Sequence, residues 1–171
     1  MKLMTKMTML CAGLALSACT NPDRFGGGNN VDLNGGANGA MVAGSANDPA
    51  SPLYFQQTIG DRVLFEVDQS NLTTFGQSTL DGQSGWLNNN VEYTALIEGH
   101  ADEQGTRQYN LALGARRANA VREYLISKGV PSNRLKVVSY GKERPLEICS
   151  EESCYAKNRR AVTVVSVVPT S

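Results

Sequence analysis

The sequence predicts an α/β two-layer sandwich in which helices cover one face of a mixed sheet. Strand-like and helix-like segments alternate from residue 61 to residue 168 in the order β-α-β-α-β-(α)-β. This alternation is typical of a sheet with helices packed against it. The chain has 171 residues, which is enough for one such domain.

Four short segments are rich in β-branched and aromatic residues and are predicted to be strands. They are residues 61–67, 93–99, 134–140 and 160–168. Residues 72–87 carry apolar side chains at near-helical spacing, although three glycines weaken this pattern. The strongest predicted helix is 107–128, which ends before Gly129 and Pro131. A possible short helix lies between the last two strands.

Residues 1–18 have the layout of a cleaved signal peptide. Lys2 and Lys6 precede an apolar run from Met7 to Leu16, and small residues follow. A membrane-spanning helix needs about 20 apolar residues, so this run predicts export of the chain and not a retained membrane span.

The residues from Leu16 to Cys19 resemble the lipobox of bacterial lipoproteins, in which the cysteine is acylated and becomes the first mature residue. The alternative is an ordinary signal peptide that ends near a cysteine. Thr20 follows Cys19, and the absence of an aspartate there, by resemblance to other lipoproteins, favours the periplasmic face of the outer membrane. No cofactor is expected beyond this covalent lipid on Cys19.

Residues 19–55 are expected to form the lipidated N-terminus and a flexible linker, because they are rich in Gly, Asn and Ala and lack apolar periodicity. Such a coil spans on the order of 30 Å in r.m.s. terms. The folded domain is then expected at 56–171.

The remaining cysteines point to a disulfide. Of the four, Cys11 leaves with the signal peptide and Cys19 carries the lipid, which leaves Cys149 and Cys154. In an exported, oxidising compartment a disulfide is the expected state of such a pair. A metal site is the alternative, but two cysteines without nearby histidines make a poor zinc site.

The composition argues against two classes of function. The formal net charge is zero, so no basic face for nucleic acid is expected. The single histidine, His100, lies near Glu98, Asp102 and Glu103, but the chain has no catalytic motif of the metalloprotease or serine hydrolase type. We therefore expect neither an enzyme nor a metal site.

One arginine stands out in the second predicted helix. An advance of about 100° per residue places Leu113, Val121 and Leu125 on one face, with Arg117 about 40° from Leu113 on that face. Burying an unpaired arginine costs several kcal/mol. Arg117 must therefore find an anion or strongly polar partners.

Asp102 is a candidate partner because it follows the second predicted strand, where loops commonly hold ligands. Spacing leaves two alternatives open. Asp102 and Arg117 either form a buried salt bridge that fixes the helix, or they face a ligand.

Three runs of residues resemble a known protein family. The run IEGHADEQGTRQYNLALGARRANAV at 97–121, the run VSYGKERP at 138–145 and the run KNRRAV at 157–162 resemble the OmpA C-terminal-like domains. Within that family they are most similar to the peptidoglycan-associated lipoproteins, and the resemblance covers 62–165.

The resemblance implies a domain that binds the peptide stem of peptidoglycan without a covalent bond, centred on diaminopimelate. Carried over by motif, Asp102 takes the ammonium of its free end and Arg117 takes the carboxylate as a bidentate fork. Further positions are expected to line or brace the site: Asp68, His100, Leu113, Asn158, Arg159 and Arg160. Each of these could instead serve the fold alone. The chain departs from the commoner family pattern at Asn71 and in the cysteine loop.

The resemblance also implies partners. It points to peptidoglycan, to TolB and to the other components of the Tol-Pal system, with roles in envelope integrity and cell division. The alternative is a lipoprotein that anchors to the wall independently of Tol proteins.

Overall fold

The computed structural model describes residues 43–167. The predicted signal peptide, the lipobox with Cys19 and most of the predicted linker lie outside the described residues. Among the residues described, no helix is long and apolar enough to cross a membrane.

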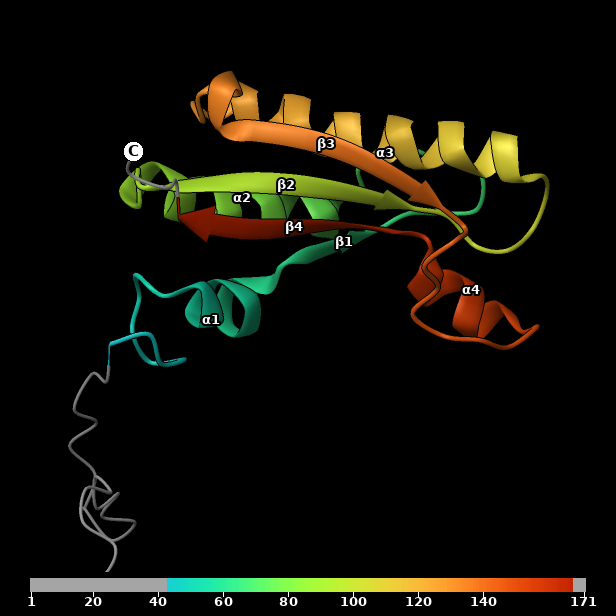
Figure 1. Ribbon diagram of the computed structural model, residues 1–171, viewed down its shortest axis with the longest axis horizontal. Coiled ribbons are helices and arrows are strands. Elements are labelled where there is room, and N and C mark those ends of the chain that lie inside the picture. The colour runs from blue at the N-terminus through green and yellow to red at the C-terminus, as the bar shows by residue number, and fades with distance from the viewer. Residues whose placement is uncertain (1–42, 168–171) are drawn as a thin grey trace, which may run out of the picture. The chain divides into compact units, whose positions relative to one another are not determined.

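The predicted α/β sandwich is confirmed, with a mixed sheet of four strands (Figure 1). The strands are β1 (Arg62–Leu64), β2 (Tyr93–His100), β3 (Leu135–Gly141) and β4 (Arg160–Val167). Their order across the sheet is β1-β4-β2-β3. β4 runs antiparallel to both of its neighbours, whereas β2 and β3 are parallel. The ends of β1, β2 and β3 and the beginning of β4 therefore meet at one end of the sheet.

Two long helices cover one face of this sheet, as Figure 1 shows. Helix α2 spans Thr74–Asn89 and helix α3 spans Arg107–Ser127. The hydroxyl groups of Thr73 and Thr106 cap their first turns by accepting backbone N–H groups, which satisfies amides that have no partner inside the helix. The core between helices and sheet is built from apolar side chains that include Leu80, Leu87, Ile97, Val121 and Leu125.

The domain begins earlier than the predicted boundary at residue 56. Helix α1 spans Pro52–Tyr54 and continues into the π-helical segment η2 (Phe55–Gly60). The Phe55 ring is buried, with its centroid 4.9 Å from that of Trp86 on α2. A short apolar stretch beside a Gly-rich linker carries little periodic signal, and this explains why the pattern missed it.

The residue after η2 extends the pairing along the outer edge of β4. β1 pairs with only the first residues of β4, so the later part of β4 has no strand beside it on that side. Asp61, which follows η2, accepts a hydrogen bond from the Thr163 amide at 2.7 Å. The buried Gln83 side chain of α2 donates to Gly60 and accepts from Thr163. These contacts satisfy the amide and the hydroxyl of Thr163 where the pairing with β1 ends.

Helix α3 crosses β2 in backbone contact at two glycines. A Cβ atom added to Gly99 would lie 1.9 Å from the carbonyl oxygen of Gly114, and one added to Gly114 would lie 2.8 Å from the carbonyl oxygen of Gly99. No side chain fits at either position. The helix can therefore lie close to the strand, near the strand end where Asp102 follows.

Two short helices complete the fold. The 3₁₀ helix η3 (Ser132–Arg134) leads into β3, and α4 (Glu152–Asn158) lies between β3 and β4. In Figure 1, α4 is at the end of the sheet where β2 and β3 terminate. The possible short helix of the sequence prediction is therefore present.

Candidate functional site

A pocket of about 260 Å³ opens at the end of the sheet described above. It is formed by the loop after β1, the turn after β2 and the first turns of α3. Its lining residues are Val67, Asp68, Asp102, Gln104, Gly105, Tyr109, Asn110 and Leu113. Three of the predicted site residues, Asp68, Asp102 and Leu113, thus meet in one pocket.

β1 ends at Leu64, three residues earlier than the predicted strand end, and Asp68 lies in the loop that follows, where the chain turns sharply. It is the one residue other than glycine with a positive φ among those described, at 56°. Non-glycine residues rarely adopt this region, and aspartate is among the few that tolerate it. The exposed Asp68 carboxylate accepts a hydrogen bond from the Tyr109 hydroxyl on α3, and this bond raises the pKa of Tyr109. The strained turn therefore holds a carboxylate at the pocket mouth.

Asn110 shapes the turn on the opposite side of the pocket. Its buried side-chain amide donates to the carbonyl oxygens of Asp102 at 3.2 Å and Gln104 at 2.7 Å. The backbone amide of Gln104 in turn donates to the Asp102 carboxylate at 3.3 Å. Sequence reasoning missed both Asn110 and Tyr109. The signal that could have found them is their place in the first turn of the helix that follows the Asp102 turn.

Arg117 is completely buried and faces the core, as its position on the helix predicts. Its guanidinium donates to three backbone carbonyl oxygens: Gln69 at 2.8 Å, His100 at 2.9 Å and Glu66 at 3.2 Å. Helical side chains lean toward the N-terminus of their helix, and this lean brings the group to the end of the sheet. Arg117 therefore clamps the loop on both sides of Asp68 to the end of β2.

The salt bridge between Arg117 and Asp102 that the sequence allowed is not formed. Across residues 43–167, no carboxylate lies within 4.0 Å of the Arg117 nitrogens, so its charge has polar partners without a counter-ion. Burial lowers the pKa of Arg117 to about 10, which still leaves it protonated at neutral pH. A buried positive charge without a carboxylate partner favours an anion nearby.

Asp102 pairs instead with Arg159. The distance between Asp102 Oδ2 and Arg159 Nη1 is 3.2 Å, and the Arg159 side chain is only 4% exposed. Arg159 also donates to the Phe65 carbonyl oxygen and forms an ion pair with Glu152 of α4. Glu152 was not among the predicted site residues, because nothing in the spacing of the sequence places it beside Asp102.

Arg160 points away from this network, contrary to the expectation that it lines or braces the pocket. Its guanidinium donates to the carbonyl oxygens of Asn158 and Arg144. Arg159 precedes the strand and Arg160 is its first residue, and neighbouring residues of an extended chain point to opposite sides. Only Arg159 can therefore reach Asp102.

The His100 ring also lies outside the pocket. It is 2% exposed, lies 3.7 Å from the Glu98 carboxylate of the same strand and packs against Tyr140, with ring centroids 5.5 Å apart. Neither ring nitrogen has a hydrogen-bond partner among the described residues. Burial lowers the pKa of His100 to about 4, and the charges of Arg160 and Arg144 contribute. Only the backbone of His100 serves the site, through its bond with Arg117.

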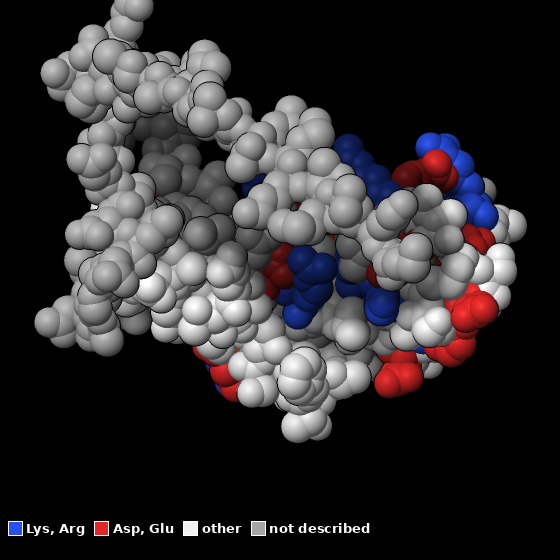
Figure 2. Space-filling view, turned by 90° about the horizontal axis from the view of Figure 1, so that it is seen from below, with Lys and Arg blue, Asp and Glu red and all other residues white. Residues whose placement is uncertain are grey.

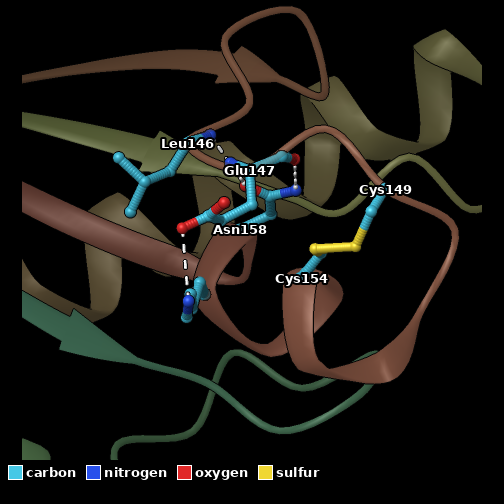
Figure 3. Close-up of a disulfide and its surroundings, with 6 residues drawn as sticks. Leu146, Glu147, Cys149, Cys154 and Asn158 are labelled. Carbon is cyan, nitrogen blue, oxygen red and sulfur yellow. Dashed lines mark hydrogen bonds and ion pairs between the residues drawn. A yellow bond between two sulfur atoms is a disulfide. The ribbon is translucent and has the colours of Figure 1, made fainter.

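Asn158 holds the loop beside the pocket and does not line it. Its side chain accepts the backbone amides of Leu146 and Glu147 and donates to the carbonyl oxygen of Glu147 (Figure 3). In the same figure, Cys149 and Cys154 form the disulfide that the sequence indicates, with Cα atoms 5.9 Å apart. The disulfide ties the first turn of α4 to this loop.

Charges of both signs are interspersed around the domain. On the face that Figure 2 shows, Lys and Arg side chains lie beside Asp and Glu side chains. The exposed ion pairs of the domain include Arg107 with Glu143 and Lys157 with Glu147. Such pairs contribute little to stability, so the buried network around Asp102 and Arg117 is the distinctive charged feature.

The OmpA family model matches residues 64–159. A peptidoglycan-associated lipoprotein of Mesorhizobium japonicum is 49% identical over 94% of this chain and 90% of its own. A peptidoglycan-associated lipoprotein of Agrobacterium fabrum is 47% identical over 89% of this chain and 82% of its own. The chain therefore belongs to the OmpA family and, within it, to the peptidoglycan-associated lipoproteins.

Solved structures agree with this assignment. The crystal structure of the peptidoglycan-associated lipoprotein from Burkholderia pseudomallei has a TM-score of 0.63 and 38% identity, and the match covers 71% of this chain and 98% of that one. The C-terminal domain of Helicobacter pylori MotB has a TM-score of 0.59 at 22% identity, covering 64% of this chain and 86% of that one. The second match shows that the fold is shared.

Arg117→Leu should lower the free energy of unfolding by about 2–4 kcal/mol, because three backbone carbonyl groups lose their donor and become unsatisfied. Chemical denaturation of the purified domain measures this change. Arg116→Leu, one residue earlier and exposed on the same helix, is the control and should change stability by less than about 0.5 kcal/mol. Equal stability of the two variants would contradict the clamp.

Stability should fall as the pH drops from about 7.5 to 5. The pKa of His100 is about 4 in the fold and 6.5 ordinarily, so the unfolded chain binds more protons between these values. The contribution of neutral His100 to the free energy of unfolding is therefore fully present above pH 6.5 and is lost as the pH falls toward 4. At pH 5 the loss is about 2 kcal/mol. Urea unfolding at several pH values measures the slope, and His100→Phe should flatten it. An unchanged slope in that variant would assign the effect to other groups.

Proposed function

We propose that this protein is a lipoprotein of the outer membrane that binds peptidoglycan without a covalent bond and so links the membrane to the wall. The observation that carries the proposal is the pocket that Asp68 and Asp102 line, with the charge of Arg117 behind it. The names of the relatives, peptidoglycan-associated lipoproteins, support the same ligand. The lipid on Cys19 would hold the other end of the link.

The ligand group is proposed to be the free end of diaminopimelate, which carries both an ammonium and a carboxylate. The carboxylates of Asp68 and Asp102 suit the ammonium. Within residues 43–167, the side chain of Asp68 has only the Tyr109 hydroxyl as a partner, and Asp102 shares Arg159 with Glu152. The charge of Arg117 suits the carboxylate. Three of its five N–H groups donate to carbonyl oxygens, so two remain for the carboxylate of the ligand.

Asp102→Asn should weaken binding to isolated sacculi by about 10- to 150-fold, because a charge-assisted hydrogen bond contributes about 1.5–3 kcal/mol. Co-sedimentation of detergent-solubilised full-length protein with sacculi measures the affinity. Glu123→Gln is the matched control, since Glu123 is an exposed carboxylate on α3 whose ion-pair partner is the neighbouring Arg122.

Competition experiments identify the ligand group. Free diaminopimelate should compete with sacculi for the unchanged protein, whereas lysine, which lacks the second carboxylate, should compete much less. If Asp102→Asn binds sacculi as well as Glu123→Gln does, the pocket is not the wall-binding site. Release of soluble fragments from sacculi would instead indicate an enzyme.

A role within the Tol-Pal system is the finer part of the proposal. Two stretches favour it by resemblance, GHADE at 99–103 and SYGKERP at 139–145, and they lie side by side because β2 and β3 are parallel neighbours. The Lys142 side chain of the second stretch donates to the carbonyl oxygens of Glu103 in the first stretch and of Gly105 just after it. Gly105 lines the pocket, so a protein bound to the exposed residues of the second stretch would obstruct binding of the wall.

TolB should therefore compete with sacculi for the full-length protein. Increasing TolB in the co-sedimentation experiment should shift the protein from the pellet to the supernatant. Co-sedimentation of TolB together with the protein would overturn the competition. If TolB does not bind at all, the protein is a wall anchor that acts without Tol proteins, which is the alternative.

A further inference from the structure

Glu152 lies outside the pocket but forms an ion pair with Arg159, the partner of Asp102. Glu152 is the first residue of α4, and its side chain is 65% exposed. Its two carboxylate oxygens engage both terminal nitrogens of Arg159, with Oε1 on Nη2 and Oε2 3.4 Å from Nη1. An exposed glutamate rarely gains from a surface ion pair. This one is different, because its partner is almost entirely buried.

Arg159 is shared between two carboxylates. Its Nε atom is fixed by the carbonyl oxygen of Phe65 at 3.2 Å, so the guanidinium cannot move freely. Glu152 occupies the two-nitrogen edge that forms bidentate pairs. Asp102 accepts from Nη1 alone, through one oxygen. Asp102 is therefore only partly neutralised, and it keeps acceptor capacity for another cation.

The position of Glu152 is itself fixed. The Glu151 carbonyl accepts the amides of Cys154 and Tyr155 in the first turn of α4, and the disulfide from Cys154 to Cys149 ties that turn to the loop before it. Glu152 lines a second hollow of about 310 Å³ together with Arg159, Glu66 and Phe65, whereas Asp102 lines the proposed wall pocket. Arg159 links the two hollows.

We infer that Glu152 is a positioning residue for the proposed wall-binding site: by holding the fork of Arg159, it keeps Asp102 available for the ammonium of the ligand. The inference rests on the proposed function. Without the Glu152 charge, the nearest carboxylate to the free edge of Arg159 is Asp102, 3.2 Å away. Asp102 would then form the bidentate pair itself and lose its capacity to accept the ligand.

Glu152→Gln tests this, with Glu151→Gln as the matched control, since Glu151 is the adjacent exposed glutamate without an ion pair among the described residues. We expect Glu152→Gln to weaken sacculus binding by roughly 3- to 10-fold while the melting temperature stays close to that of Glu151→Gln. The loss should vanish when Asp102→Asn is already present, because both changes act on the same carboxylate. Unchanged or tighter binding by Glu152→Gln overturns the inference, as does a loss that persists in the Asp102→Asn background.

A second measurement tests the coupling between Glu152 and Asp102 without peptidoglycan. The Gln104 amide donates to Asp102, so its NMR signal should shift in Glu152→Gln and not in Glu151→Gln. An unmoved signal overturns the inference whatever the sacculi show. If the signal shifts in Glu152→Gln but the unchanged protein does not bind sacculi, the coupling of Glu152 to Asp102 stands, whereas the proposed function and the role of Glu152 in it are refuted.

Discussion

The buried guanidinium of Arg117 is the interaction on which this end of the molecule depends. It joins the loop after β1 to the end of β2 through three carbonyl oxygens, although the two segments are far apart in sequence. Carbonyl groups can solvate a buried cation without cancelling its charge. The same residue therefore shapes the pocket and supplies a positive potential behind it, so its structural and proposed binding roles are not alternatives.

The glycine crossing makes this arrangement possible. Gly99 and Gly114 let α3 lie against β2 at backbone distance, and Arg117 follows less than one turn later on the same helix. A larger residue at either glycine would lift the helix and move the guanidinium away from the His100 carbonyl. The shape of the pocket is thus set by the absence of side chains in the core as much as by the presence of charged ones around it.

The charged groups around Asp102 differ in how far each one is neutralised by a partner. Arg117 has no carboxylate partner among the described residues, Arg159 has two, and Asp68 has only a hydroxyl. This arrangement suits a zwitterionic ligand, because each charge of the ligand meets a group that is not fully neutralised. One of the two carboxylates on Arg159 is that of Glu152 in α4, the helix that the disulfide ties to the preceding loop.

The sequence by itself determined the class of fold, the main helices and strands, the cysteine pair and the burial of Arg117, because these follow from local periodicity and composition. It also indicated Asp68, Asp102 and Leu113 as site residues through their resemblance to the family. It placed the start of the domain too late and extended the first strand too far, since a short apolar segment and a strained turn leave little periodic signal. Only the tertiary structure decided that Asp102 pairs with Arg159, that the His100 ring and Arg160 lie outside the pocket, and that Glu152 joins the network. The physical reason is that these partners come from segments that are distant in sequence. The fold brings their ends together, and the spacing of residues within one segment does not specify this.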